Sequence, residues 1–287
     1  MIKNRYILVF ILSLLIITAL PTVNSIKAKE VTTAVTIVPQ KQFVSVVAGE
    51  NSEVTVMIPP GYSPGNYAPR PSELTKFSDA DIYFSIGVPA DIQNILPKAK
   101  EFNQDIKIVN LAERVSQKYD DRTFPNGSRD PHIWLSPKRV IHIVKVIRDE
   151  LINLNPQKEQ LYKENTAEYI EKIRETDQKV KSILNEKENN YFLVYHPSFG
   201  YFADEYNLNM VSIEEGGKEA TAKHLQEIID FAKKNNIERI FYQAEIDSRQ
   251  TQALAEEIGA ELVKLDPLAE NYLNNLIEMA KKLAGDE

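Results

Sequence analysis

Three side chains that could bind one divalent metal ion are spread along this 287-residue chain: His132, His196 and Asp266. Two neutral imidazoles and one carboxylate are a plausible ligand set for a divalent transition metal, above all Zn²⁺. The three residues stand far apart in the sequence, so their spacing forms no motif. The prediction of a metal site therefore depends on the elements that must position them.

His132 lies in a segment whose backbone is held on both sides. Pro131 restricts the chain directly before it, and an apolar-periodic run begins at Pro137. Ser136 can cap that run as a helix, with Pro137 at the first helical position. A histidine between a rigid turn and a helix start has a defined direction, which suits a metal ligand. The alternative is a loop histidine that is hydrogen-bonded to backbone.

Strand and helix patterns alternate along the chain, which predicts α/β lobes with parallel sheets flanked by helices. Strands are expected at 34–39, 54–58, 81–87, 106–111, 191–195, 208–213, 239–243 and 261–265. Helices are expected at 40–48, 72–77, 137–154, 222–235, 248–258 and 271–283. His196 and Asp266 each follow a predicted strand, at the sheet edge where α/β proteins bind ligands. His142 and His224 fall within predicted helices and are expected to be solvated.

One longer helix is predicted at 157–185, where apolar residues recur on one side. At 1.5 Å per residue it would be about 40 Å long, enough to bridge two lobes. A coiled-coil segment is the alternative. We therefore expect an N-terminal lobe at 26–154, a linking helix at 155–187 and a C-terminal lobe at 188–287.

Residues 1–25 have the pattern of a cleaved secretory signal. Lys3 and Arg5 precede an uncharged apolar run at 6–20, and small residues suited to cleavage follow it. The run is short for a membrane span, which needs about 20 apolar residues; an uncleaved N-terminal anchor is the alternative. The sequence contains no cysteine. We therefore expect an exported protein, periplasmic or otherwise extracytoplasmic, that is not lipid-anchored through cysteine.

Composition and charge narrow the function classes. With a net charge of −7 and a pI near 5.4, the chain has no excess of basic residues to bind the phosphates of a nucleic acid. Nucleic acid is therefore not an expected partner. Without cysteine there is neither a disulfide nor a thiolate to bind metal. A nucleotide site is not expected either, because Gly216-Gly217-Lys218 lacks the rest of a phosphate-binding loop.

Six short segments, taken in order, resemble one family: the zinc- and manganese-binding solute-binding proteins of ABC transporters. They are 59–61 (PPG), 67–72 (YAPRPS), 78–81 (SDAD), 130–134 (DPHIW), 196–202 (HPSFGYF) and 266–268 (DPL). Each segment is a weak signal alone, but the six in sequence are specific and cover essentially the whole mature chain. The resemblance implies two α/β lobes joined by one long rigid helix, with the metal bound in the cleft between them.

The resemblance also implies roles for single residues. His132 resembles a histidine ligand of the family and Asp266 its carboxylate ligand. His196 stands where zinc-type members have histidine and manganese-type members have glutamate, so zinc is expected rather than Mn²⁺. The chain departs from the family at Gly65, where members usually have a further histidine, and it lacks their histidine-rich loop before Asp130.

Three protein ligands leave a fourth coordination position. The candidates for it are water, Tyr67, Asn66, Glu214 and Glu245, of which water is favoured. For Tyr67 the alternative role is loop packing, and for the two glutamates it is a solvated surface.

The resulting functional hypothesis is a monomeric binding protein that captures zinc and delivers it to an ABC permease in the membrane, without enzymatic activity. One alternative is a zinc-dependent hydrolase that activates water at the open coordination position. The sequence contains no His-Glu-x-x-His helix to support it. A second alternative is an adhesin, or a receptor for another solute, that has lost metal transport.

Overall fold

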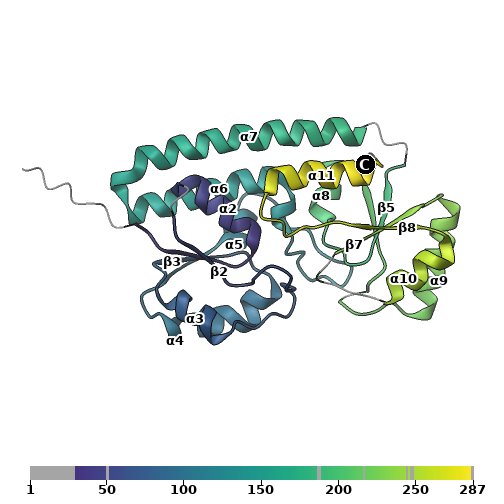
Figure 1. Cartoon of the computed structure of the whole chain (residues 1–287), viewed down its shortest axis with the longest axis horizontal. Helices are drawn as coiled ribbons and strands as arrows, with labels where there is room; N and C mark the ends of the chain where they lie inside the picture. Colours follow the sequence, from purple (N-terminus) through teal and green to yellow (C-terminus); the bar gives the residue numbers. More distant parts are fainter. Residues whose placement is uncertain are drawn as a thin grey trace, which may run out of the picture.

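The computed structural model describes residues 30–49, 52–185, 189–215, 217–243, 245 and 249–285. These residues form two α/β lobes side by side, and the long helix α7 (Glu159–Asn185) runs along both of them (Figure 1). The predicted signal at 1–25 lies outside the described residues. In the part of the chain that is described, no helix has the length and apolar character needed to span a bilayer.

Each lobe contains a parallel four-stranded sheet. The first has the order β2 (Val54–Val56), β1 (Thr33–Val35), β3 (Ile82–Ser85), β4 (Lys107–Asn110). The second has the order β6 (Asn209–Ser212), β5 (Tyr191–Val194), β7 (Arg239–Tyr242), β8 (Glu261–Lys264). Both sheets place their strands in the chain order second, first, third, fourth. The predicted fold class, two lobes with parallel sheets joined by one long helix, is confirmed.

Helices cover both faces of the first sheet (Figure 1). On the side of α7 lie α2 (Val38–Ala48), α5 (Leu111–Ser116) and α6 (Pro137–Leu154). On the other side lie α3 (Pro71–Ser78), a π-helical turn (Asp91–Ile95) and α4 (Leu96–Phe102). The Ser136 side chain accepts the Arg139 amide and caps α6, as predicted. Single 3₁₀ turns precede α6 (Ile133–Leu135) and α7 (Pro156–Lys158). The helices at 91–102 and 111–116 were not predicted, because such short helices give almost no periodic signal.

The second sheet is covered in the same way. Helices α8 (Gly200–Glu205) and α11 (Tyr272–Ala284) lie on the side of α7, and α9 (Ala222–Lys234) and α10 (Arg249–Ile258) lie on the other side (Figure 1). Because side chains alternate along a strand, β5 contributes to two cores. Phe192 and Val194 join the core on the α7 side, whereas Leu193 and Tyr195 join a smaller core beneath α9 and α10.

The larger core crosses from one lobe to the other. It contains Val35 and Phe84 of the first sheet, Ile173 of α7, and Phe192 and Leu276 of the second lobe in one contiguous cluster of buried side chains. Separating the lobes would expose this shared apolar surface to water, which is unfavourable. The lobes are therefore joined by packing as well as by the chain.

Polar contacts accompany the shared core at the lobe boundary. The indole Nε1–H of Trp134 donates to the carbonyl of Pro267 at 2.8 Å. The backbone N–H of Arg122 donates to the Tyr201 hydroxyl at 2.9 Å. These bonds tie the segment around His132 to the second lobe.

We expect Trp134→Phe to lower the free energy of unfolding by about 1–3 kcal/mol, because it leaves the buried Pro267 carbonyl without its donor. Urea denaturation followed by circular dichroism measures this loss. Tyr191→Phe is the control, because Tyr191 is 38 % exposed. Removing its hydroxyl should change the free energy of unfolding by less than about 0.5 kcal/mol. Equal stability of Trp134→Phe and the wild type would contradict the assigned role of the bond.

Candidate metal centre

His132 is held by the carboxylate two residues before it. Oδ1 of Asp130 lies 3.0 Å from the backbone nitrogen of His132 and 2.7 Å from its ring nitrogen Nδ1. A carboxylate accepts hydrogen bonds, so Nδ1 carries the proton and Nε2 keeps its lone pair. This is the tautomer that presents Nε2 to a metal ion.

Asp130 is itself fully buried and connects His132 to the lobe boundary. Its second oxygen, Oδ2, lies 3.4 Å from Nε of Arg122, whose guanidinium is also 3.9 Å from Asp204 on α8. Gly200 permits this approach, because a Cβ at that position would lie 2.7 Å from Oδ2 of Asp130. The arginine charge compensates the buried carboxylate that orients the histidine.

His196 has an equivalent partner in the second lobe. It follows β5, and its Nδ1 lies 2.9 Å from Oε2 of Glu214, which follows the neighbouring strand β6. Glu214 is 7 % exposed, so its carboxylate is fixed in place. The ring of His196 therefore also keeps its lone pair on Nε2.

The two imidazoles are adjacent although 63 residues separate them in the chain. Their ring centroids lie 5.4 Å apart with the ring planes at 75°. The structure thus brings together two of the three predicted ligands. One nitrogen of each ring is assigned to a carboxylate and the other is free for a shared cation.

Burial lowers the pKa of His132 from its ordinary value of 6.5, and the hydrogen bond and charge of Asp130 only partly oppose the effect. The folded protein therefore favours the neutral ring, the form that can bind a metal. The unfolded chain takes up a proton at a higher pH than the folded chain does. Stability linked to His132 is therefore complete above pH 6.5 and is lost as the pH falls through the range below it.

Asp266 follows β8, as predicted, and its Oδ1 accepts the backbone N–H of Leu268 at 3.0 Å. The next residue, Pro267, is the one that binds Trp134, so this segment is tied to the segment of His132. Within the described ranges, however, no three histidine, aspartate or glutamate side chains are grouped closely enough to hold a metal. The structure thus places His132 with His196, and the addition of Asp266 to them stays a prediction.

The candidates for the fourth coordination position differ in how they are engaged. The Tyr67 hydroxyl donates to both oxygens of Glu73 at 2.7 Å. Burial is the main reason that the pKa of Tyr67 is raised to about 12, and the hydrogen bond to Glu73 adds to the rise. Its phenolate is therefore disfavoured. Glu214 is hydrogen-bonded to His196, and Asn66 is exposed. Glu245 is near Asp266: burial raises its pKa, and the charge of Asp266 adds to the rise.

Sequence reasoning missed the orienting role of the two carboxylates, although it named Glu214 as a candidate for the fourth coordination position. Asp130 had a local signal, because an aspartate two residues before a histidine in Asp-Pro-His can fold back onto it. Glu214 had none, since its contact depends on the pairing of β5 with β6. The expectation that His142 and His224 are solvated was wrong. Both are half-buried, with Nε2 3.0 Å from the Arg114 carbonyl and 3.4 Å from the Ser212 carbonyl, respectively.

The chain has relatives among curated proteins. It is 29 % identical to the zinc-binding protein AdcA of Streptococcus pyogenes serotype M3, over 84 % of this chain and 50 % of that protein. It is 26 % identical to the high-affinity zinc uptake system protein ZnuA of Bacillus subtilis, over 81 % of this chain and 77 % of that protein. The chain spans about half the length of the AdcA relatives that it matches.

Solved structures and a family model agree with these matches. A crystal structure of ZnuA superposes with a TM-score of 0.84 at 33 % identity and covers 90 % of this chain and 99 % of that one. A zinc-bound deletion mutant of ZnuA gives a TM-score of 0.83, also at 33 % identity, over 89 % of this chain and 97 % of that one. The family described as "Zinc-uptake complex component A periplasmic" matches residues 33–285. The chain belongs to this family of periplasmic zinc-uptake components.

Proposed function

We propose that this chain is an extracytoplasmic solute-binding protein that captures Zn²⁺ between its two lobes and delivers it to an ABC permease. The single observation that carries the proposal is the contact between His132 and His196, whose ring centroids lie 5.4 Å apart. Each ring has its Nδ1 bound to a carboxylate, which is the arrangement found around protein-bound zinc. The zinc named in the curated relatives supports this choice of metal.

In this proposal the ligands are Nε2 of His132, Nε2 of His196 and the carboxylate of Asp266. Asp130 and Glu214 do not touch the metal. Their hydrogen bonds make the two imidazoles better electron donors, and their negative charges favour a cation nearby. Water takes the fourth position, because Gly65 provides no side chain there and Tyr67 is bound to Glu73.

The proposed role is binding and release, without turnover. A transport receptor must let the ion go to its permease, so a site with three protein ligands and water is compatible with the function. The partial exposure of His196 also suits this role. Because 26 % of its side chain is exposed, an ion can reach the site from solvent on one side.

Zinc is expected to raise the melting temperature of the wild-type protein, because a ligand at 100 times its dissociation constant adds about 2.7 kcal/mol to stability. His196→Ala is expected to abolish most of this rise, and His224→Ala to keep it, since His224 lies outside the candidate site. Differential scanning calorimetry with and without Zn²⁺ makes the comparison. A rise of equal size in His196→Ala and the wild type would rule out the proposed site.

Asp130→Asn tests whether the buried carboxylate acts through His132. Asparagine keeps the shape but removes the charge, so we expect zinc affinity to fall about 10–100-fold, the usual effect of losing such a partner. Competition titration with a zinc chelator measures the affinity. Asp105→Asn on the exposed surface should change it little. An affinity that Asp130→Asn leaves intact would show that the carboxylate has only a structural role.

Gly65→His should restore the ligand that other family members have. The position is exposed, and an added Cβ would meet only the Ser63 hydroxyl at 3.3 Å, so a side chain fits with a small shift. We expect tighter zinc binding, because a fourth protein ligand replaces water. The same chelator competition applies, with Gly65→Ala as the control for backbone effects. Unchanged affinity would place residue 65 outside the coordination sphere.

A further inference from the structure

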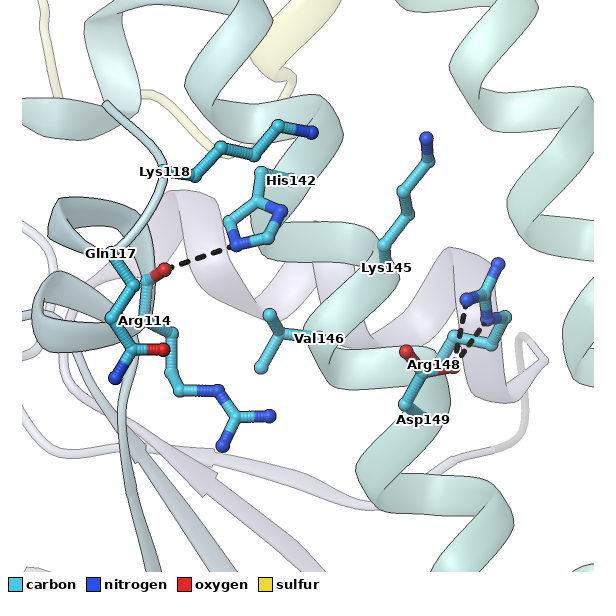
Figure 2. A pocket seen from close by; sticks show the side chains of 8 residues that line it. All are labelled: Arg114, Gln117, Lys118, His142, Lys145, Val146, Arg148 and Asp149. Carbon is cyan, nitrogen blue, oxygen red and sulfur yellow. Dashed lines mark hydrogen bonds and ion pairs between the residues drawn. The ribbon is translucent and has the colours of Figure 1, made fainter.

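A polar pocket lies on the first lobe between α5 and α6, and Figure 2 shows its lining. It is open to solvent and has a volume of about 620 Å³. Cationic side chains converge on it from α5, from the residues that follow α5, and from α6. We call it the α5–α6 pocket; the residues that carry the argument are Arg114, Lys118, His142, Lys145, Arg148 and Asp149. None of them belongs to the candidate metal centre.

The positive charges in this pocket are only partly compensated. Arg148 pairs with its neighbour Asp149 at 2.7 Å, and Arg114 lies 3.5 Å from Glu150. Lys118 and Lys145 form no ion pair with any carboxylate in the described part of the chain. Two ammonium groups without a carboxylate partner therefore line one open pocket on a protein whose net charge is −7. Gathering like charges is unfavourable unless an anion joins them.

His142 lies close to both lysines, since the charges of Lys118 and Lys145 act on its ring. In Figure 2 the Lys118 side chain runs across the view above the ring, and the Lys145 side chain rises from α6 beside it. Its Nε2–H donates to the Arg114 carbonyl at 3.0 Å, which leaves Nδ1 as a free acceptor. Burial lowers the pKa of His142, and the cations Lys118, Lys145 and Arg114 add to this. An anion beside the lysines would offset that repulsion and so favour protonation of Nδ1, which could then donate to the anion.

We propose that the α5–α6 pocket binds a phosphate group, with Lys118 and Lys145 as its principal contacts and protonated His142 as a further donor. Two ammonium groups match the charge of a phosphate dianion, and charge-assisted hydrogen bonds to phosphate are strong. The pocket has room for more than one phosphate, so a phosphate group carried by a larger molecule also fits it. Its source is either a soluble phosphate compound or the headgroup of an anionic lipid.

Isothermal titration of the whole chain with inorganic pyrophosphate, at constant ionic strength, tests the proposal. The double variant Lys118→Ala/Lys145→Ala is expected to bind at least about tenfold more weakly than the wild type, since each lost charge-assisted bond is equivalent to about tenfold in affinity. The control is Lys163→Ala/Lys172→Ala on the exposed face of α7, which removes the same charge. It should bind like the wild type.

A second readout follows the histidine rings by NMR. Pyrophosphate is expected to shift the His142 ring signals toward those of the protonated form and to leave those of His224 in place. Melting curves and circular dichroism spectra of each variant show that it is folded. If a lysine variant passes both of these folding checks but no longer binds pyrophosphate, the loss of binding arises in the pocket.

Vesicles distinguish the two sources of phosphate. Sedimentation with phosphatidylglycerol vesicles, but not with phosphatidylcholine vesicles, that depends on Lys118 and Lys145 supports a lipid headgroup. Saturable pyrophosphate binding with the same dependence, in the absence of vesicle binding, supports a soluble phosphate compound. Equal weakening in both double variants, or saturable binding to neither probe, overturns the proposal. These outcomes do not depend on whether the protein binds zinc.

Discussion

The hydrogen bond from the His132 ring to the buried Asp130 carboxylate is the interaction on which the candidate metal centre depends. At 2.7 Å it sets the tautomer of the ring, and the backbone bond to the same oxygen sets the direction of the chain. The buried carboxylate requires compensation, which Arg122 of the same lobe supplies while its guanidinium also lies 3.9 Å from Asp204 of the second lobe. Orientation of one imidazole is thus linked to the contact between the two lobes. His196 and Glu214 repeat the pairing on the other side.

The shared hydrophobic core explains how two such separate histidines stay close together. Helix α7 packs against α2 and α6 of the first lobe and against α11 of the second. Buried side chains from both lobes form one cluster beneath it. Any large opening of the lobes would expose part of that cluster, so adjustment at the site is expected to be local.

The departure at Gly65 has a physical consequence for the proposed cargo. With the three proposed protein ligands the ion would keep a water molecule, so binding would be weaker and release easier than with four. The loop around Gly65 is otherwise well supported. Tyr67 is buried and bound to Glu73, and the Ala90 amide donates to the Pro64 carbonyl at 3.0 Å. The loop therefore keeps its conformation without contributing a histidine.

Most of the fold followed from local patterns, because strand and helix periodicity are properties of short stretches of sequence. The strands were predicted close to their observed positions: their ends agree or differ by one or two residues, except that the first strand was predicted to end four residues too late. The start of α6 at Pro137 and the length of α7 also agree with the prediction, and so do the places of His196 and Asp266 after their strands. The sequence alone also singled out His132, through the prolines and the capping serine around it.

Contacts between residues distant in the chain were decided only by the tertiary structure. The approach of His132 to His196, the pairing of His196 with Glu214, and the partial burial of His142 each join different elements. The convergence of Lys118 and Lys145 on one pocket is of the same kind. A local pattern reports which side of a helix or strand is apolar, but not which other element will cover it. The sequence thus determined the elements and the candidate ligands, and the packing of the two lobes decided which side chains meet.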